Sequence, residues 1–309
     1  MIRSMQSAIA GLKSHQTKMD VIGNNIANVN TWGYKSKAAN FADAMYQNYI
    51  TGAAGNTTVG NLGGINASQI GYGANVSSIS ANYETGTQSY TGRAFDCMID
   101  GPAFFIVGPM QVAGGVNPDA IANSGLSLSR VGVFDMDSNG YLVDNQGNYV
   151  YGYTTGTGDG QGNITVNTNT DLEPIRLNVG IQDAVGGGEV AINYASMQIG
   201  TDGIITVVDK DTNQAYVVGQ IALATVENVG GLEQDSGYLY GIGDNAGAVD
   251  IGPQTKATGR VLSGYLEMSN VDLATEMSYM ITTQRGYQAN TRMITVSDQM
   301  LEELVNMKR

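Results

Sequence analysis

The sequence predicts an α+β protein, with a mainly-β middle flanked by a discontinuous α-helical coiled-coil domain built from both chain ends. Three observations lead to this class. At each end, apolar residues follow alternating steps of three and four, which is the heptad period of a helix packed along a narrow stripe. Between the ends, short alternating or apolar runs are separated by turn pairs such as Asn139-Gly140, which is typical of β-hairpins. Finally, most of the acidic charge lies between the two ends.

The first helix is expected over about residues 4–26. An asparagine- and glycine-rich stretch follows it, and such residues supply left-handed backbone and side-chain caps that end a helix. Six apolar residues lie on the stripe, and Ile22 lies beside it. The residues that we assign to helix pairing or self-assembly at this end are Ile2, Met5, Ile9, Leu12, Met19, Ile22 and Ile26.

The middle of the chain divides into three predicted parts. Residues 36–69 are expected to form a connecting segment, because 51–69 consist largely of Gly, Asn, Thr and Ala with few groups to bury. A β-rich domain is expected over 70–154 and 196–264, and an additional small outer β subdomain or insertion over 155–195. The strands expected in the β-rich domain are 75–79, 104–107, 141–143, 149–153, 204–208 and 216–224.

The last helix is expected to begin after Ser269 and Asn270, either of which suits an N-cap, and to end at about residue 307. Its length of about 55 Å exceeds the diameter of a small domain. Further apolar residues lie off the stripe and require additional helices, which many copies of one chain would supply in a helical filament. The stripe residues that we assign to self-assembly here are Leu273, Met277, Met280, Tyr287, Ile294, Leu301 and Val305.

The charge and composition argue against several functions. The formal net charge is −13, and residues 38–264 hold 21 acidic and six basic residues, which argues against a nucleic-acid partner. No run of 18 apolar residues exists, so membrane insertion is not expected. One cysteine excludes an intrachain disulfide, and the chain start does not resemble a secretory signal.

Motifs for catalysis or cofactor binding are weak. Residues 135–140 match the first half of a calcium loop, but residue 146 is Gln where a bidentate Glu is needed, so a hairpin turn is the better interpretation. His15 is the only histidine and lies on the first helix. We therefore expect no enzyme activity, no metal and no cofactor. A secreted β-rich enzyme or carbohydrate-binding module with coiled-coil ends stays open as an alternative.

Both ends of the chain resemble one known family, the rod and hook proteins of the bacterial flagellar axis. The asparagine-rich turn, with Asn24, Asn25, Asn28, Gly33 and Tyr34, carries part of this likeness. The matching segments are 16–35 (QTKMDVIGNNIANVNTWGYK), 264–274 (GYLEMSNVDLA), 284–290 (QRGYQAN), 101–105 (GPAFF) and 129–134 (SRVGVF). Residues 69–73, together with the N-terminal run, make the hook subunit the nearest match. The short chain keeps the distal rod subunit as the alternative.

The resemblance implies a structural subunit that assembles with itself into a helical homopolymer. As a hook subunit it would form a curved tube that transmits torque from the rod to the filament, with the terminal helices as an inner tube. The implied partners are flagellar rod and hook-filament junction proteins, a hook cap and the type III export apparatus. The implied location is the flagellum, outside the cell, after export without a cleaved signal peptide.

Overall fold

The computed structural model describes residues 2–54, 64–110, 125–154, 156–158, 164–167, 171–181, 189–211, 213–252 and 258–307. The chain forms two compact units. Unit 1 comprises Met1–Val29, Ser36–Asn82 and Val271–Arg309, and unit 2 comprises Asn30–Lys35 and Tyr83–Asn270. Each unit therefore takes segments that are far apart in the sequence. Two terminal helices and a mostly-β middle confirm the predicted α+β class.

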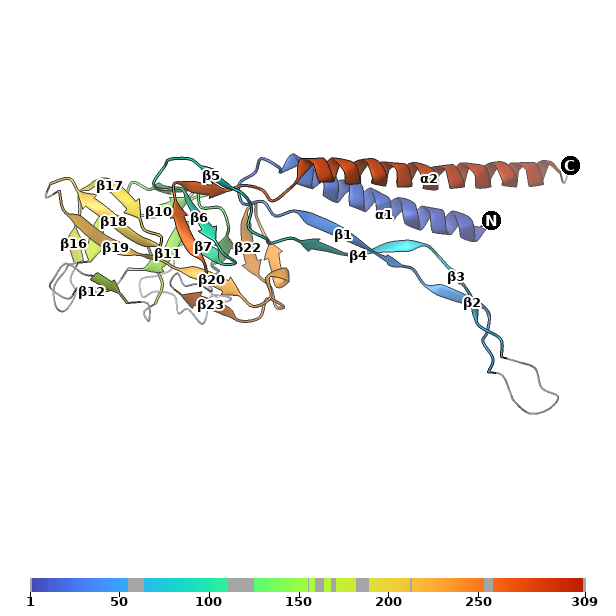
Figure 1. Cartoon of the computed structure of the whole chain (residues 1–309), viewed down its shortest axis with the longest axis horizontal. Helices are drawn as coiled ribbons and strands as arrows, with labels where there is room; N and C mark the ends of the chain where they lie inside the picture. The colour runs from blue at the N-terminus through green and yellow to red at the C-terminus, as the bar shows by residue number, and fades with distance from the viewer. Residues whose placement is uncertain are drawn as a thin grey trace. The chain divides into compact units, whose positions relative to one another are not determined.

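Unit 1 contains the two long helices, α1 (Ile2–Ala27) and α2 (Leu273–Asn306), which lie side by side in Figure 1. Both agree with the predicted helices to within two or three residues. The cap of α2 differs from the prediction, since Asp272 takes that place instead of Ser269 or Asn270. Its carboxylate accepts a hydrogen bond from the Ala274 amide at 3.1 Å, which satisfies one of the donors that a helix start leaves unpaired.

The rest of unit 1 is a two-stranded antiparallel ribbon. Strand β1 (Lys37–Asp43) pairs with β4 (Ala74–Ala81), and β2 (Tyr46–Ile50) pairs with β3 (Ser68–Gly71) further along the same ribbon (Figure 1). The sequence predicts a connecting segment over 36–69 and a β domain from residue 70. In the structure, strands occupy much of 36–69 and group with the helices. All residues of strands β2 and β3 are exposed, because a two-stranded ribbon buries little of its own surface.

Unit 2 is built around a 13-stranded sheet, whose main path runs β17-β18-β19-β11-β7-β8-β22-β21. Strands β9, β10, β14, β20 and β23 join this sheet, and four hairpins or pairs lie outside it: β5–β25, β6–β24, β12–β13 and β15–β16. The elements of unit 2 are β5 (Gln88–Tyr90), β6 (Cys97–Asp100), β7 (Phe104–Gly108), β8 (Ser127–Ser129), β9 (Phe134–Met136), β10 (Leu142–Asp144), β11 (Tyr149–Tyr153), β12 (Gly156–Gly158), β13 (Ile164–Val166), β14 (Glu173–Pro174), β15 (Val179–Ile181), β16 (Glu189–Ala191), β17 (Tyr194–Ile199), β18 (Ile204–Asp209), β19 (Ala215–Ile221), β20 (Leu223–Val226), the 3-10 helix η2 (Val229–Gly231), β21 (Leu232–Gln234), β22 (Leu239–Ile242), β23 (Val249–Gly252), β24 (Arg260–Ser263) and β25 (Tyr265–Glu267).

Strand β7 separates two apolar cores in unit 2. All five of its residues are buried. Because side chains alternate along a strand, Phe105 and Val107 enter one core, whereas Phe104 and Ile106 enter the other. A strand buried on both faces explains why this segment is a continuous apolar run and not an alternating one.

The predicted strands of unit 2 and one predicted turn are confirmed. A strand overlaps each expected segment: β10 begins one residue later than the expected 141–143, and 216–224 is divided between β19 and β20. The expected strand 75–79 is β4, which belongs to unit 1. The calcium-like segment is the hairpin turn between β9 and β10, where Gly140 has φ +85° and its amide donates to the Asp137 carbonyl at 2.9 Å. The proposed outer subdomain over 155–195 includes the paired strands β12–β13 and β15–β16, and parts of it, such as 182–188, lie outside the described residues. The domain boundaries from sequence stay a prediction.

Candidate self-assembly surface

The two helices of unit 1 pack antiparallel at close range. Residues Gly11 and His15 of α1 meet Asn290 and Gly286 of α2, respectively, so the residue numbers rise in one helix as they fall in the other. A Cβ atom added at Gly11 would lie 2.7 Å from Asn290 Nδ2, and one added at Gly286 would lie 2.7 Å from His15 Cε1. The absence of a side chain at these two positions therefore permits the close approach of the helices.

Asn25 joins three segments of unit 1. It is 1% exposed, and its amide nitrogen donates to the Lys37 carbonyl at 2.8 Å and to Glu276 Oε1 at 3.1 Å. Its side-chain oxygen accepts from the Lys37 amide at 3.0 Å. A buried amide with this many partners fixes α1, the start of β1 and the first turn of α2 in one register.

His15 lies where α1 meets both β1 and α2. Its ring stands edge-on to Phe41, with 5.7 Å between ring centroids, and touches α2 at Gly286. The Lys18 ammonium lies 5.2 Å from the Phe41 ring centroid. Burial and the nearby Lys18 charge both lower the pKa of His15. The Nδ1 atom is buried and has no hydrogen-bond partner among the described residues, so the neutral ring fits this place better than the cation.

The seam of α2 differs from the predicted stripe in one of its two rows. Four predicted residues are partly buried: Met280, Tyr287, Ile294 and Leu301. The other predicted apolar residues are exposed: Leu273 by 47%, Met277 by 48% and Val305 by 66%. Small or polar residues take the second row, and its members are Glu276, Thr283, Asn290 and Ser297. Apolarity alone could not identify a row made of such residues.

The predicted residues of α1 are placed in a similar way. Ile22 is buried, and Met5, Leu12, Met19 and Ile26 are half-buried. Ile9 is 43% exposed, and the side chain of Ile2 lies outside the described residues. The contacts to α2 come from the neighbouring row with Gly11, His15 and Asn25. The assignment of both predicted sets to self-assembly stays a prediction.

Apolar side chains are distributed very unevenly between the two units. Among the described residues, only Ala8 and Ile22 of the 39 buried apolar residues belong to unit 1. By contrast, 19 of the 22 large apolar residues that are exposed lie in unit 1. Half of this exposed set lies along α2, and much of the rest lies on the ribbon, where Met45 is 84% and Tyr49 is 73% exposed. Exposed apolar surfaces of this extent are typical of interaction sites.

The asparagine-rich turn ends α1 and leads the chain into unit 2. Asn28 caps the helix through its backbone amide and its side chain, which both donate to the Asn24 carbonyl, at 3.1 and 2.9 Å. Gly33 has φ +66°, and its amide donates to the Glu267 carbonyl at 2.8 Å. The Tyr34 carbonyl accepts from the Asn270 amide at 3.4 Å. The turn residues of the family motif thus connect the chain passage at 30–35 with the one at 264–270.

A buried cluster of charges strengthens this connection in unit 2. Lys35 Nζ lies 2.6 Å from Glu267 Oε1, and Arg130 Nη1 lies 3.6 Å from Glu267 Oε2. All three side chains are at most 2% exposed. Lys35 also donates to the Glu84 carbonyl at 2.8 Å, and the Arg130 guanidinium stacks over Phe104 at 4.7 Å. We refer to Lys35, Arg130 and Glu267 as the charge clamp.

Burial lowers the pKa of Lys35 and of Arg130, whereas Glu267 opposes this effect by favouring their charged forms. All three residues lie within the family motifs, and the sequence predicts no role for them. A signal was available, since each is a charged residue inside a run of otherwise small or apolar residues. The pairing of Glu267 with Lys35, 232 positions away, and with the distant Arg130 was not readable from one sequence.

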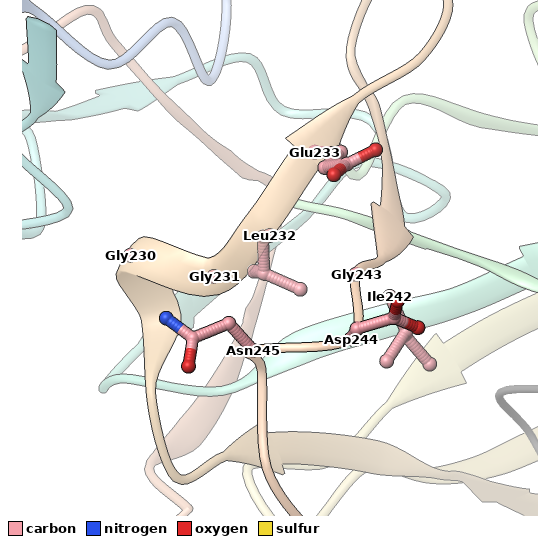
Figure 2. A pocket seen from close by; sticks show the side chains of 8 residues that line it. All are labelled: Gly230, Gly231, Leu232, Glu233, Ile242, Gly243, Asp244 and Asn245. Carbon is pink, nitrogen blue, oxygen red and sulfur yellow. The ribbon is translucent and has the colours of Figure 1, made fainter.

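A pocket of about 480 Å³ in unit 2 is lined by residues 230–233 and 242–245. Its charged side chains are Glu233 and Asp244, and Figure 2 shows the lining side chains spread around the pocket instead of converging on one point. No cluster of potential metal ligands occurs among the residues that the structure describes. Neither described helix is long and apolar enough to cross a membrane. We assign no ligand to this pocket.

Comparisons with known proteins find family matches at both ends of the chain, where the sequence motifs lie. Residues 5–35 match the family described as flagella basal body rod protein, and residues 262–307 match the C-terminal family of the flagellar basal body rod FlgEFG proteins. The flagellar basal-body rod protein FlgG of Bacillus subtilis is 36% identical over 313 residues and covers all of both chains. FlgG of Buchnera aphidicola (Schizaphis graminum) is 32% identical, covering 98% of this chain and 99% of its own. The flagellar hook protein FlgE of Borreliella burgdorferi is 29% identical over a 444-residue alignment that covers both chains completely.

Proposed function

The chain belongs to the family of flagellar basal-body rod and hook proteins, and from this membership we propose that it is a structural subunit of the distal rod. It is an axial component of the bacterial flagellum. Its proposed activity is assembly with copies of itself and with adjoining axial proteins, not catalysis. The expected contacts with a cap and an export apparatus, and export without a cleaved signal, stay predictions.

The exposed apolar surface of unit 1 is the observation that supports self-assembly. The described part of unit 1 buries two apolar residues and leaves 19 large ones exposed. At about 25 cal/mol per Å² of apolar surface removed from water, covering such a surface with neighbouring chains supplies a substantial driving force. The middle of the chain already has two cores of its own, so assembly does not need to complete unit 2.

The choice between rod and hook depends on chain length. Sequence motifs favour the hook subunit, with the rod as the alternative. The alignments to rod proteins span 302–313 positions, close to the 309 residues of this chain. The alignment to the hook protein needs 444 positions, which means that the hook protein has long insertions that this chain lacks. We therefore propose the distal rod subunit as the first candidate and keep the hook subunit as the second.

Electron microscopy of the purified full-length chain after concentration tests this proposal. We expect straight, stiff tubes, and we expect no tubes from a chain shortened to end before α2. Curved or supercoiled tubes would favour the hook instead. A full-length chain that stays monomeric at every concentration would contradict self-assembly, while a shortened chain that still forms tubes would contradict the role of the helices.

A further inference from the structure

Apart from Tyr279 and Val305, the exposed large apolar residues on α2 and just past its end fall into two separate patches. The first patch consists of Leu273, Met277 and Ile281, which are 47%, 48% and 57% exposed. The second patch consists of Met293, Val296, Met300, Leu304 and the C-cap residue Met307, which are between 43% and 83% exposed. Both patches contain three apolar residues spaced four apart. They are residues 273, 277 and 281 in the first patch and residues 296, 300 and 304, each 23 positions later, in the second.

The patches point in different directions around the helix. At about 100° per residue, the mean directions of the two patches lie about 140° apart. On the side of α2 that faces α1, the row with Glu276 and Asn290 separates the first patch from the second. On the outward side, the exposed Arg285 and Arg292 lie between the patches and divide one from the other. The α1–α2 pair thus presents one apolar patch on each flank of its own seam.

We propose that the first patch of one copy of this chain docks on the second patch of the next copy. This inference rests on the proposed function, since it names how self-assembly uses α2. The two patches are complementary in shape, because ridges formed by residues four apart on one helix pack into the grooves between ridges of the same type on a second helix. The patch centres, at Met277 and Met300, are about 35 Å apart along the helix, so successive copies would be staggered by about that distance.

The size of the patches argues for a repeating contact instead of a closed dimer. A stable interface buries about 800 Å² on each partner. Three and five partly exposed side chains leave only a few hundred Å² on each flank. A two-fold dimer that covered one patch with its own copy would leave the other patch in water on both chains. A head-to-tail contact covers both patches on every interior copy and continues without closing, which generates a filament.

Disulfide cross-linking of polymers distinguishes the two arrangements. Met277→Cys and Met300→Cys are made in separate full-length chains, in which the native Cys97 is fully buried and burial raises its thiol pKa. Each variant is assembled alone and as an equal mixture, oxidised, and examined by electrophoresis without reductant. We expect a covalent dimer in the mixture and none in either variant alone. A 277–277 or 300–300 dimer, or polymers without any 277–300 dimer, would overturn the proposal.

A second pair guards against a local effect of substitution. Ile281→Cys and Leu304→Cys have the same 23-residue offset and should behave identically, whereas Gln288→Cys, exposed in the middle of α2, should cross-link with neither Met277→Cys nor Met300→Cys. Wild-type chain is assembled in parallel. If it forms no polymer, the proposed function fails; if it forms polymers in which neither pair cross-links, the docking mode alone fails.

Discussion

The two units of this molecule differ in where their polar and apolar side chains lie. Unit 2 has two apolar cores and places a compensated charge cluster beside them, with Lys35 and Arg130 on either side of Glu267. In the α2 seam of unit 1, a row of small or polar residues lies beside a partly buried apolar row, and 19 large apolar side chains of the unit are exposed. Unit 2 is therefore organised around its own interior, whereas unit 1 is organised around surfaces that other molecules must cover.

The largest effect is expected from the charge clamp, which tests how self-sufficient unit 2 is. Glu267→Gln leaves Lys35 and Arg130 buried without a counter-charge, which should cost about 3–5 kcal/mol of unfolding free energy. Urea unfolding followed by the fluorescence of Trp32, the single tryptophan, measures this, because Trp32 belongs to unit 2.

The matched control for the clamp is an exposed ion pair in the same unit. Arg260 Nη2 lies 3.4 Å from Asp100 Oδ2, and their side chains are 69% and 50% exposed. Asp100→Asn should change the unfolding free energy by less than about 1 kcal/mol. Equal losses for the two substitutions would show that burial of the clamp has no special role.

A smaller effect is expected from glycine substitutions in the helices of unit 1. Alanine favours a helix over glycine by about 1 kcal/mol. At Gly23 an added Cβ meets nothing within 4 Å, so Gly23→Ala should strengthen α1. At Gly286 the added Cβ meets the His15 ring at 2.7 Å, and overpacking of about 1–3 kcal/mol should outweigh the gain in propensity.

Sedimentation of assembled polymers and helical circular dichroism measure both glycine variants. We expect a lower assembled fraction for Gly286→Ala and an equal or higher one for Gly23→Ala. If Gly286→Ala assembled as well as Gly23→Ala, the close approach of the helices would not matter for the polymer.

The smallest effect is expected from pH and concerns His15. Its pKa is lowered from 6.5 in the packed unit, so the unpacked state binds the proton more readily. The stabilisation that neutral His15 gives to the packed unit is fully present above about pH 6.5. It is lost as the pH falls through 6.5 toward the lowered pKa of His15. Lys18 adds repulsion, while Phe41 and Gly286, which contact the ring, carry no compensating charge.

The assembled fraction at pH 8, 6.5 and 5.5 checks this sign. We expect a modest decrease for the wild-type chain and a flatter profile for His15→Gln, which cannot titrate. Because His15 is the only histidine, few other groups change charge in this window. A wild-type polymer that became more stable toward pH 5.5 would contradict the assignment.

Sequence periodicity was sufficient for some features and insufficient for others, for identifiable reasons. The helices and the strand at Phe104–Gly108 carry strong local patterns, so they were predictable. Half of the α2 seam was predictable from Met280 and Leu301, because apolar residues mark it. The half with Thr283 and Ser297 was not, because small polar residues are typical of solvent-facing positions as well.

The ribbon and the clamp depend on long-range pairing, which a single sequence does not encode visibly. Strand β1 pairs with β4 across about 30 intervening residues, and the Gly- and Asn-rich stretch between them suggested a linker. Lys35 finds Glu267 from the opposite end of the chain. Both features require knowledge of which distant segments meet, and local composition carries no such information.

The clamp also makes the ends of the chain independent of what lies between them. Hydrogen bonds and an ion pair join Gly33, Tyr34 and Lys35 to residues 267–270. Since only a few residues link these two passages to the helices, the start of α2 stays close to the end of α1. The helices then find each other at the high effective concentration of a short tether, whatever the length of the intervening polypeptide. Insertions between these two tied passages would therefore leave the connection between the terminal helices unchanged.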